Sequence, residues 1–289
     1  MFTDRISREA GRISEELKRT GYSVVPGAVP PGAIASIDHS LLPHFASAPF
    51  EIQDPELSRV QRIWRLLIRA PATEQLVRHG VILKAVEDIL IRGSRTVQLS
   101  LAEGVARHPG ERAGIPFRDQ LMWRGCDNSF EYGVNVLWPL TPSRAENGAM
   151  RIWPGSHCSD DLEPATRSSG ISIQLEPGDA LLYLGSTLHS AGGNGSEAVS
   201  RSITIGYCLD WLKPAENPWL AYPPEVARSF APELAALVGY RRQLTSLGSF
   251  EGQCPSVLLD PQKAAGFAIR DQACSGKSIS MPAGRKPRS

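Results

Sequence analysis

The part of the chain that follows Gly93 consists of short runs rich in β-branched and aromatic residues, separated by clusters of turn-forming residues. The runs cover residues 95–102, 132–140, 149–153, 171–175, 179–184 and 201–209, and Glu176-Pro177-Gly178-Asp179 is the clearest turn. Many short strands joined by such turns are typical of a β-sandwich or jelly roll, whereas a parallel sheet alternates its strands with helices. We therefore expect a mainly β fold with flanking α-helices.

The residues before this part are expected to be mainly helical. The first helix has its apolar side chains on one face and ends at Gly21, the residue that favours a helix C-terminus. Its apolar positions are Ile6, Ala10, Ile13 and Leu17. A short strand at 22–26 follows, then a helix that starts at Pro30 and Pro31. Residues 56–92 also read as mostly helical.

We expect one domain over residues 1–289 in four parts. They are a helical part (1–92), a jelly-roll core (93–211), a C-terminal lid or dimer segment (212–275) with a helix near 224–239, and a disordered tail (276–289).

Composition excludes several classes of protein. The formal net charge of +1 indicates neither a nucleic-acid partner nor an acidic membrane surface. No apolar run reaches the roughly 18 residues of a membrane helix, and the charged N-terminal segment does not read as a signal peptide. The cytoplasm is the expected location. The five cysteines form no CxxC pair, which predicts reduced thiols rather than a zinc site.

Three polar residues in the β-rich part have the order and separation of a non-haem iron site. Asp119 and His189 are candidate metal ligands, and Arg201 follows His189 on the last strand. Two histidines and one carboxylate hold iron(II) in such sites, which leaves positions open for substrate and oxygen. The arginine fork binds the distal carboxylate of 2-oxoglutarate.

Several motifs give this pattern a specific resemblance. They are PFRDQ at 116–120, YGVNVLWPLT at 132–141, ENGAMRIWPGSH at 146–157, GDALLYLGSTLHSAGGN at 178–194 and GYCLDWLKPAEN at 206–217. In order and spacing the chain resembles the phytanoyl-CoA dioxygenase family of iron(II)/2-oxoglutarate oxygenases, and within it the members of fungal meroterpenoid and terpenoid pathways. The resemblance implies a double-stranded β-helix of the cupin-like kind, with iron(II) and 2-oxoglutarate as cofactors.

The chain departs from this family at three positions. The first histidine of the family's His-x-Asp motif is Phe117 here, and a phenyl ring has no lone pair for a metal. Gly114 and Met150 stand where the family has Gln and Thr, which contact the co-substrate. Loss of even an outer hydrogen-bond partner of a ligand lowers metal affinity roughly 10- to 100-fold. Iron and 2-oxoglutarate binding by this chain is therefore expected to be weak.

Other residues near the motifs are open to two interpretations. Met122, Trp123, Tyr132 and Trp138 are candidate walls of a pocket for a small apolar substrate, or else packing residues of the barrel. His108 and His157 are candidates for a replacement metal ligand.

The resemblance implies a homo- or heterodimer with a homologous oxygenase, since family members of this type commonly dimerise through a C-terminal segment. Three hypotheses of function follow. The first hypothesis is a non-catalytic or impaired subunit of secondary-metabolite biosynthesis that pairs with a complete homologue. The second is an active oxygenase with an atypical site, in which Asp119, His189 and 2-oxoglutarate hold iron and a terpenoid-like substrate is hydroxylated or desaturated. The third is a metal-free isomerase or small-molecule binder.

Overall fold

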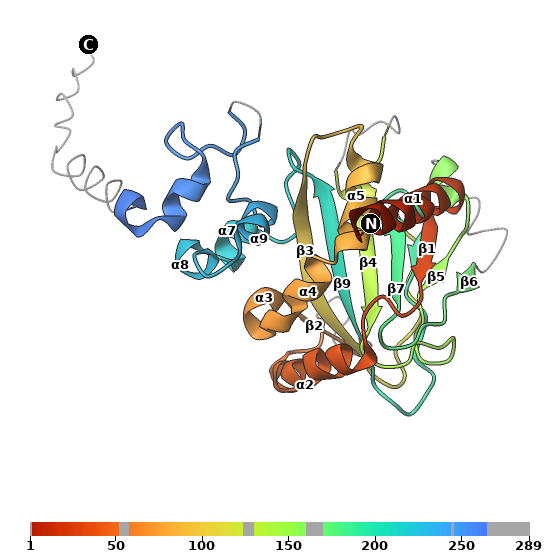
Figure 1. Cartoon of the computed structure of the whole chain (residues 1–289). Coiled ribbons are helices and arrows are strands. Elements are labelled where there is room, and N and C mark those ends of the chain that lie inside the picture. Colours follow the sequence, from red (N-terminus) through yellow and green to blue (C-terminus); the bar gives the residue numbers. More distant parts are fainter. Residues whose placement is uncertain (1, 52–57, 124–129, 160–169, 244–245, 265–289) are drawn as a thin grey trace, which may run out of the picture.

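The computed structural model describes residues 2–51, 58–123, 130–159, 170–243 and 246–264. Two antiparallel sheets form its centre (Figure 1). The strand order is β1-β7-β4-β9-β3-β2 in the six-stranded sheet and β6-β5-β8 in the three-stranded sheet. The predicted jelly-roll architecture with flanking helices is confirmed.

The long strands all belong to the larger sheet. Its strands are β1 (Tyr22–Val25), β2 (Val60–Ile63), β3 (Val97–Arg107), β4 (Gly133–Pro139), β7 (Ala180–Leu184) and β9 (Ser200–Leu209). The smaller sheet has two-residue strands: β5 (Arg151–Ile152), β6 (Ile171–Ser172) and β8 (His189–Ser190). β8 was not predicted, because two residues are too few to show an alternating pattern.

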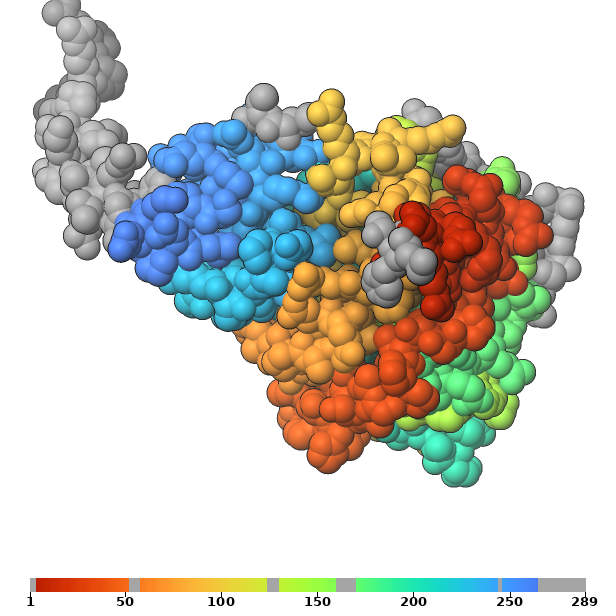
Figure 2. All heavy atoms as spheres, in the orientation of Figure 1, coloured from red at the N-terminus to blue at the C-terminus, as the bar shows by residue number. Residues whose placement is uncertain are grey.

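Helices from the N-terminal part cover one face of the larger sheet (Figures 1 and 2). They are α1 (Phe2–Thr20), α2 (Pro31–Ser47), α3 (Leu66–Arg69), η1 (Pro71–Thr73), α4 (Glu74–Val77) and α5 (Gly80–Leu90). The apolar stripe of α1 is fully buried at Ala10, Ile13 and Leu17, and α1 packs against α5. Gly21 ends α1 with a φ of +85°, as its place in the sequence predicted.

Alternation along β9 separates the helix-covered core from the opposite face of the sheet. Ile203 and Ile205 are fully buried in the core beneath the helices. Ser202 and Thr204 alternate with these two isoleucines along the strand, so they point to the other face, where they line a cavity. Two short 3₁₀ helices, η2 (Asp119–Met122) and η3 (Ser156–Cys158), lie in the connections that follow β3 and β5.

Two predicted helical stretches are corrected. Within 56–92 the described residues include the edge strand β2, whose β-branched ends Val60 and Ile63 are buried, and the remainder forms four short helices. The helix expected near 224–239 is broken in two. Pro232 has no N–H to continue a helix and holds Ala231 in an extended conformation (φ −57°, ψ 147°).

The C-terminal segment contains four short helices in its described part: α7 (Pro218–Ala221), α8 (Pro224–Ala227), α9 (Pro232–Leu237) and η4 (Pro255–Leu259). It lies beside β3 (Figure 1), and Arg241 donates to the Val97 carbonyl there at 2.9 Å. The predicted tail at 276–289 lies outside the described residues. Among the helices that the structure describes, none is long and apolar enough to cross a membrane.

Candidate functional site

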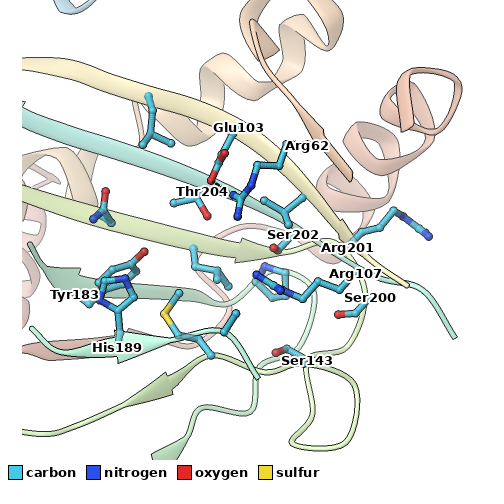
Figure 3. A pocket seen from close by; sticks show the side chains of 18 of the residues that line it. Arg62, Glu103, Arg107, Ser143, Tyr183, His189, Ser200, Arg201, Ser202 and Thr204 are labelled. Carbon is cyan, nitrogen blue, oxygen red and sulfur yellow. Dashed lines mark hydrogen bonds and ion pairs between the residues drawn. The ribbon is translucent and has the colours of Figure 1, made fainter. Parts of the chain in front are cut away.

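A cavity of about 150 Å³ lies between the two sheets (Figure 3). Its floor comes from the non-core faces of the long strands β3, β4, β7 and β9, and its opposite wall comes from β8 and the segments around it. The residues that carry polar chemistry into it are Arg62, Glu103, Arg107, Asp119, Asn135, Ser143, Tyr183, His189, Ser200, Ser202 and Thr204. A second cavity of about 580 Å³ shares Arg62, Arg107, Phe117 and Ala191 with the first, so the two adjoin.

Asp119 and His189 meet in the inner cavity. Asp119 is the first residue of η2, and its Oδ2 lies 3.4 Å from Nε2 of His189. The same Oδ2 accepts a hydrogen bond of 2.5 Å from Asn135 on β4. Burial raises the pKa of the Asp119 carboxyl, while the neighbouring His189 acts to lower it.

The hydrogen bonds of His189 define the tautomer of its ring. Nδ1 lies 2.9 Å from the carbonyl of Thr187, and a carbonyl only accepts, so Nδ1 carries a proton. The other nitrogen, Nε2, faces the Asp119 carboxyl. Nε2 and the carboxylate oxygen can both accept a proton or bind a cation placed between them. Two metal ligands would offer the same pair of acceptor atoms.

Phe117 stands directly beside this pair. Its backbone N–H donates to the carbonyl of His189 at 2.9 Å, and the His189 N–H donates back at 3.0 Å. The phenyl ring lies 4.5 Å from the imidazole, measured between ring centroids. Position 117 thus lies next to the imidazole, and its ring supplies no donor atom.

Arg201 borders the cavity, but its guanidinium is engaged on the other side of the sheet. Its Nε and Nη2 each donate to a different oxygen of Asp38 on α2, both at 2.7 Å. In Figure 3 its side chain leads away from the cavity. Strand alternation explains this direction, because Ser200 and Ser202 on either side of Arg201 face the cavity. The edge of the guanidinium formed by Nε and Nη2 is therefore occupied by Asp38.

A further cation that points into the cavity is Arg107 at the end of β3, a residue that the sequence reasoning missed (Figure 3). Period-two alternation from Glu103 and Val105 was the signal that could have found it. Burial, and then the nearby Arg62, lower the pKa of its guanidinium. Arg62 itself is paired with Glu51 and with Glu103, the latter at 2.7 Å.

The other predicted positions divide between the cavity and the packed interior. Met150 lines the inner cavity and Gly114 the outer one. Of the proposed substrate walls, Trp138 and Tyr132 belong to the core beneath the helices, and Trp123 packs against that core. Met122 is half exposed, and neither it nor Trp123 lines the cavity between the sheets. Of the two interpretations, pocket wall and packing residue, the structure favours packing for Trp138 and Tyr132.

The two replacement histidines lie away from the Asp119–His189 pair. Nε2 of His108 contacts Oε1 of Gln61 at 2.7 Å, and its ring packs edge-on against Phe50. Nε2 of His157 contacts the Lys18 carbonyl at 2.9 Å. The cysteines that the structure describes, Cys158, Cys208 and Cys254, are free thiols.

The family model of phytanoyl-CoA dioxygenase (PhyH) matches residues 17–203. The chain belongs to this family. The dioxygenase cdmD of Talaromyces verruculosus is 36% identical over 141 residues, which is 46% of each chain. The multifunctional dioxygenase ausE of Aspergillus calidoustus is 26% identical over 80% of this chain and 84% of its own. The chain thus spans less than half of cdmD but most of ausE.

Solved structures of similar fold agree with the architecture. The non-haem epimerase SnoN of nogalamycin biosynthesis, in complex with Fe3+ and alpha ketoglutarate, superimposes with a TM-score of 0.55. It is 21% identical, and the match covers 70% of this chain and 84% of SnoN.

The residues of this chain do not fit the iron that membership of the phytanoyl-CoA dioxygenase family implies. The family's site needs two histidines and a carboxylate. Here Asp119 and His189 are accompanied by Phe117, which has no atom that could bind a metal. Within the described parts of the chain, no three His, Cys, Asp or Glu side chains come together as a metal site would require. A two-ligand site is too weak to rely on, since loss of even an outer partner lowers affinity roughly 10- to 100-fold.

Proposed function

We propose that this chain is a catalytically impaired member of the phytanoyl-CoA dioxygenase family that acts in secondary-metabolite biosynthesis as the partner subunit of a complete homologue. The observation that carries the proposal is Phe117. It is paired through its backbone to His189, and its ring lies 4.5 Å from the imidazole at an interplanar angle of 54°. We take this position as that of the missing third ligand. In this proposal the phenyl ring of Phe117 occupies the position of a ligand side chain but offers no lone pair to a metal.

The metabolic setting is inferred from relatives. Fungal proteins named as dioxygenases match the chain, and the similar structure of SnoN comes from nogalamycin biosynthesis. A small apolar substrate, of the terpenoid kind that the family resemblance implies, would suit the apolar side chains near the cavity mouth.

Exposed apolar side chains in the segment around Phe117 support the partner role. In the segment that carries Phe117, the exposed fractions are 85% for Ile115, 63% for Leu121 and 47% for Met122. Large exposed apolar groups gathered in one segment are unusual on a monomer and are typical of interaction sites. The C-terminal segment offers a second such set, with Trp219 and Leu220 exposed by 49% and 77%. In the family resemblance, such a C-terminal segment reaches the active-site mouth of the neighbouring subunit.

The active-oxygenase alternative requires Arg201 to anchor 2-oxoglutarate. That role would need the two hydrogen bonds to Asp38 to break first. No contact among the described residues favours this rearrangement.

Co-expression with a homologue that has the complete triad tests the proposal. We expect the two chains to co-elute as a heterodimer, and we expect the isolated chain to form no succinate from 2-oxoglutarate. Ile115→Asp and Leu121→Asp should weaken the heterodimer, because they place charge among the exposed apolar side chains of the segment that carries Phe117. Leu42→Asp, which alters an exposed apolar residue on α2, is the matched control and should not. A chain that elutes alone contradicts the partner role, and turnover by the isolated chain contradicts the impaired site.

A further inference from the structure

Among the described residues that line the inner cavity, Arg107 is a cation whose guanidinium makes no hydrogen bond or ion pair. Arg62 is held by Glu51 and Glu103, and Arg201 is held by Asp38. Among the residues that the structure describes, no hydrogen bond or ion pair of the Arg107 guanidinium is present, although its side chain points into the cavity (Figure 3). A partly buried cation of this kind favours an anionic ligand, since burial without a partner is costly.

The chain holds Arg107 in place from three sides. The strand register sets it directly opposite Ser200 of β9. Its carbonyl accepts a hydrogen bond of 2.9 Å from Asn194. Gly148 leaves space for its stem, because a Cβ at that glycine would lie 3.1 Å from Cδ of Arg107. These contacts fix the backbone of Arg107 and leave room for its stem, so the side chain can reach into the cavity without rearrangement of the strand.

Hydroxyl groups of Ser143, Ser200, Ser202 and Thr204 line the same cavity as Arg107. In the described structure none of these hydroxyls has a hydrogen-bond partner, so they are available to a ligand. A carboxylate beside Arg107 would accept charge-assisted bonds from the guanidinium and further bonds from hydroxyls. Apolar walls from Leu101, Val105 and Met150 would contact the hydrocarbon part of the same ligand.

Size and charge narrow the class of ligand. The cavity volume of about 150 Å³ is roughly ten times the 10–15 Å³ that one water requires, so it suits a molecule of about ten non-hydrogen atoms. A second carboxylate would find no second cation, because Arg62 and Arg201 are already paired, and it would face Glu103 or Asp119. A ligand with one carboxylate is therefore favoured over a dicarboxylate.

We propose that this cavity binds a small monocarboxylic acid through Arg107, and that it does so without a metal ion. The site is distinct in its anchor from Arg201, the residue at the family's expected position. It does not depend on the partner role, because it uses residues of this chain alone.

Calorimetric titration of the full chain in EDTA tests the inference with three matched probes: hexanoate, the neutral hexanamide and the dicarboxylate adipate. We expect hexanoate to bind, and hexanamide and adipate to bind at least tenfold more weakly. Arg107→Gln should weaken hexanoate binding by about tenfold or more, the scale of a lost charge-assisted hydrogen bond. Arg201→Gln is the matched control and should leave the affinity unchanged.

Arg107→Lys is a second variant that guards against a folding artefact. It keeps the positive charge and loses only the two-pronged donor geometry of the guanidinium, so it should retain part of the affinity for hexanoate. Equal affinity of the wild type and Arg107→Gln would overturn the proposal, as would equal binding of hexanoate and hexanamide. Absence of hexanoate binding in EDTA would also overturn it, and would leave the proposed partner function standing. Tight binding of 2-oxoglutarate only when iron(II) is added would instead contradict both.

Discussion

Asp38 and Arg201 are far apart in the sequence, yet they form a two-bond ion pair between α2 and β9. Both side chains are largely buried, with 20% of the Arg201 side chain and 15% of the Asp38 side chain exposed. Hydrogen bonding to Asp38 is the main cause that raises the pKa of the Arg201 guanidinium. We infer that this arginine now joins a helix to the sheet.

Replacing Asp38 by Asn should therefore lower the free energy of unfolding. The expected loss is about 1.5–3 kcal/mol, the usual net value of hydrogen bonds to a charged group. Urea denaturation monitored by circular dichroism measures it. Glu15→Gln is the control, because its pair with Lys18 is exposed and should contribute less than about 1 kcal/mol. Equal losses in the two variants would show that the Asp38 pair adds no stability.

Individual residues of the site could be predicted from the sequence only in part. Motif spacing brought Phe117, Asp119 and His189 to attention, and the structure places all three in one cavity, although their metal role stays a prediction. The direction of Arg201 could not be predicted, because it depends on a partner 163 residues away. Arg107 was missed because no motif contains it.

At the scale of elements, the turn Glu176–Asp179 fixes the start of α2 to β7. The Val29 N–H donates to the Gly178 carbonyl at 3.1 Å, and Oδ1 of Asp179 accepts from the Gly27 N–H at 2.9 Å. Gly178 has a φ of +110°, and a Cβ there would lie 2.5 Å from the Val29 carbonyl oxygen. Only glycine allows this close approach.

Two glycine substitutions separate backbone strain from this close approach. Gly27 has a φ of +58°, and a Cβ added there would meet open space. Gly27→Ala should therefore lower the free energy of unfolding by about 1–2 kcal/mol through backbone strain alone. Gly178→Ala adds a collision with the Val29 carbonyl oxygen, and it should lower the free energy of unfolding by about 1–3 kcal/mol more. Thermal unfolding of both variants measures the difference. If Gly178→Ala were no less stable than Gly27→Ala, the turn would not pack on α2 as described.

Elements with a clear period were predictable and the others were not. The apolar stripe of α1 and the β-rich run at 201–209 gave correct types and nearly correct ends. β2 was read as helix because a four-residue run carries both patterns equally well. The C-terminal helix was overestimated because local propensity ignored the break at Pro232.

Across the whole molecule, the two faces of the larger sheet have separate roles. One face builds the apolar core with the N-terminal helices, and the other builds the polar cavity with the small sheet. Phe117 is not among the core side chains that pack beneath the helices, so a change of side chain at position 117 should leave the fold intact. The proposed impaired site thus lies on a fold whose core does not include position 117.

Iron(II) titration of the wild-type chain and of Phe117→His tests this account most directly. The substitution should fold, since the Phe117 side chain is half exposed. It adds an imidazole beside Asp119 and His189 and should raise iron affinity at least tenfold, by comparison with the roughly 10- to 100-fold effect of weaker partners. Leu121→His adds the same group at an exposed position that lines neither cavity, and it should leave the affinity unchanged. A wild-type chain that already binds one iron tightly, with no gain from Phe117→His, would contradict the account.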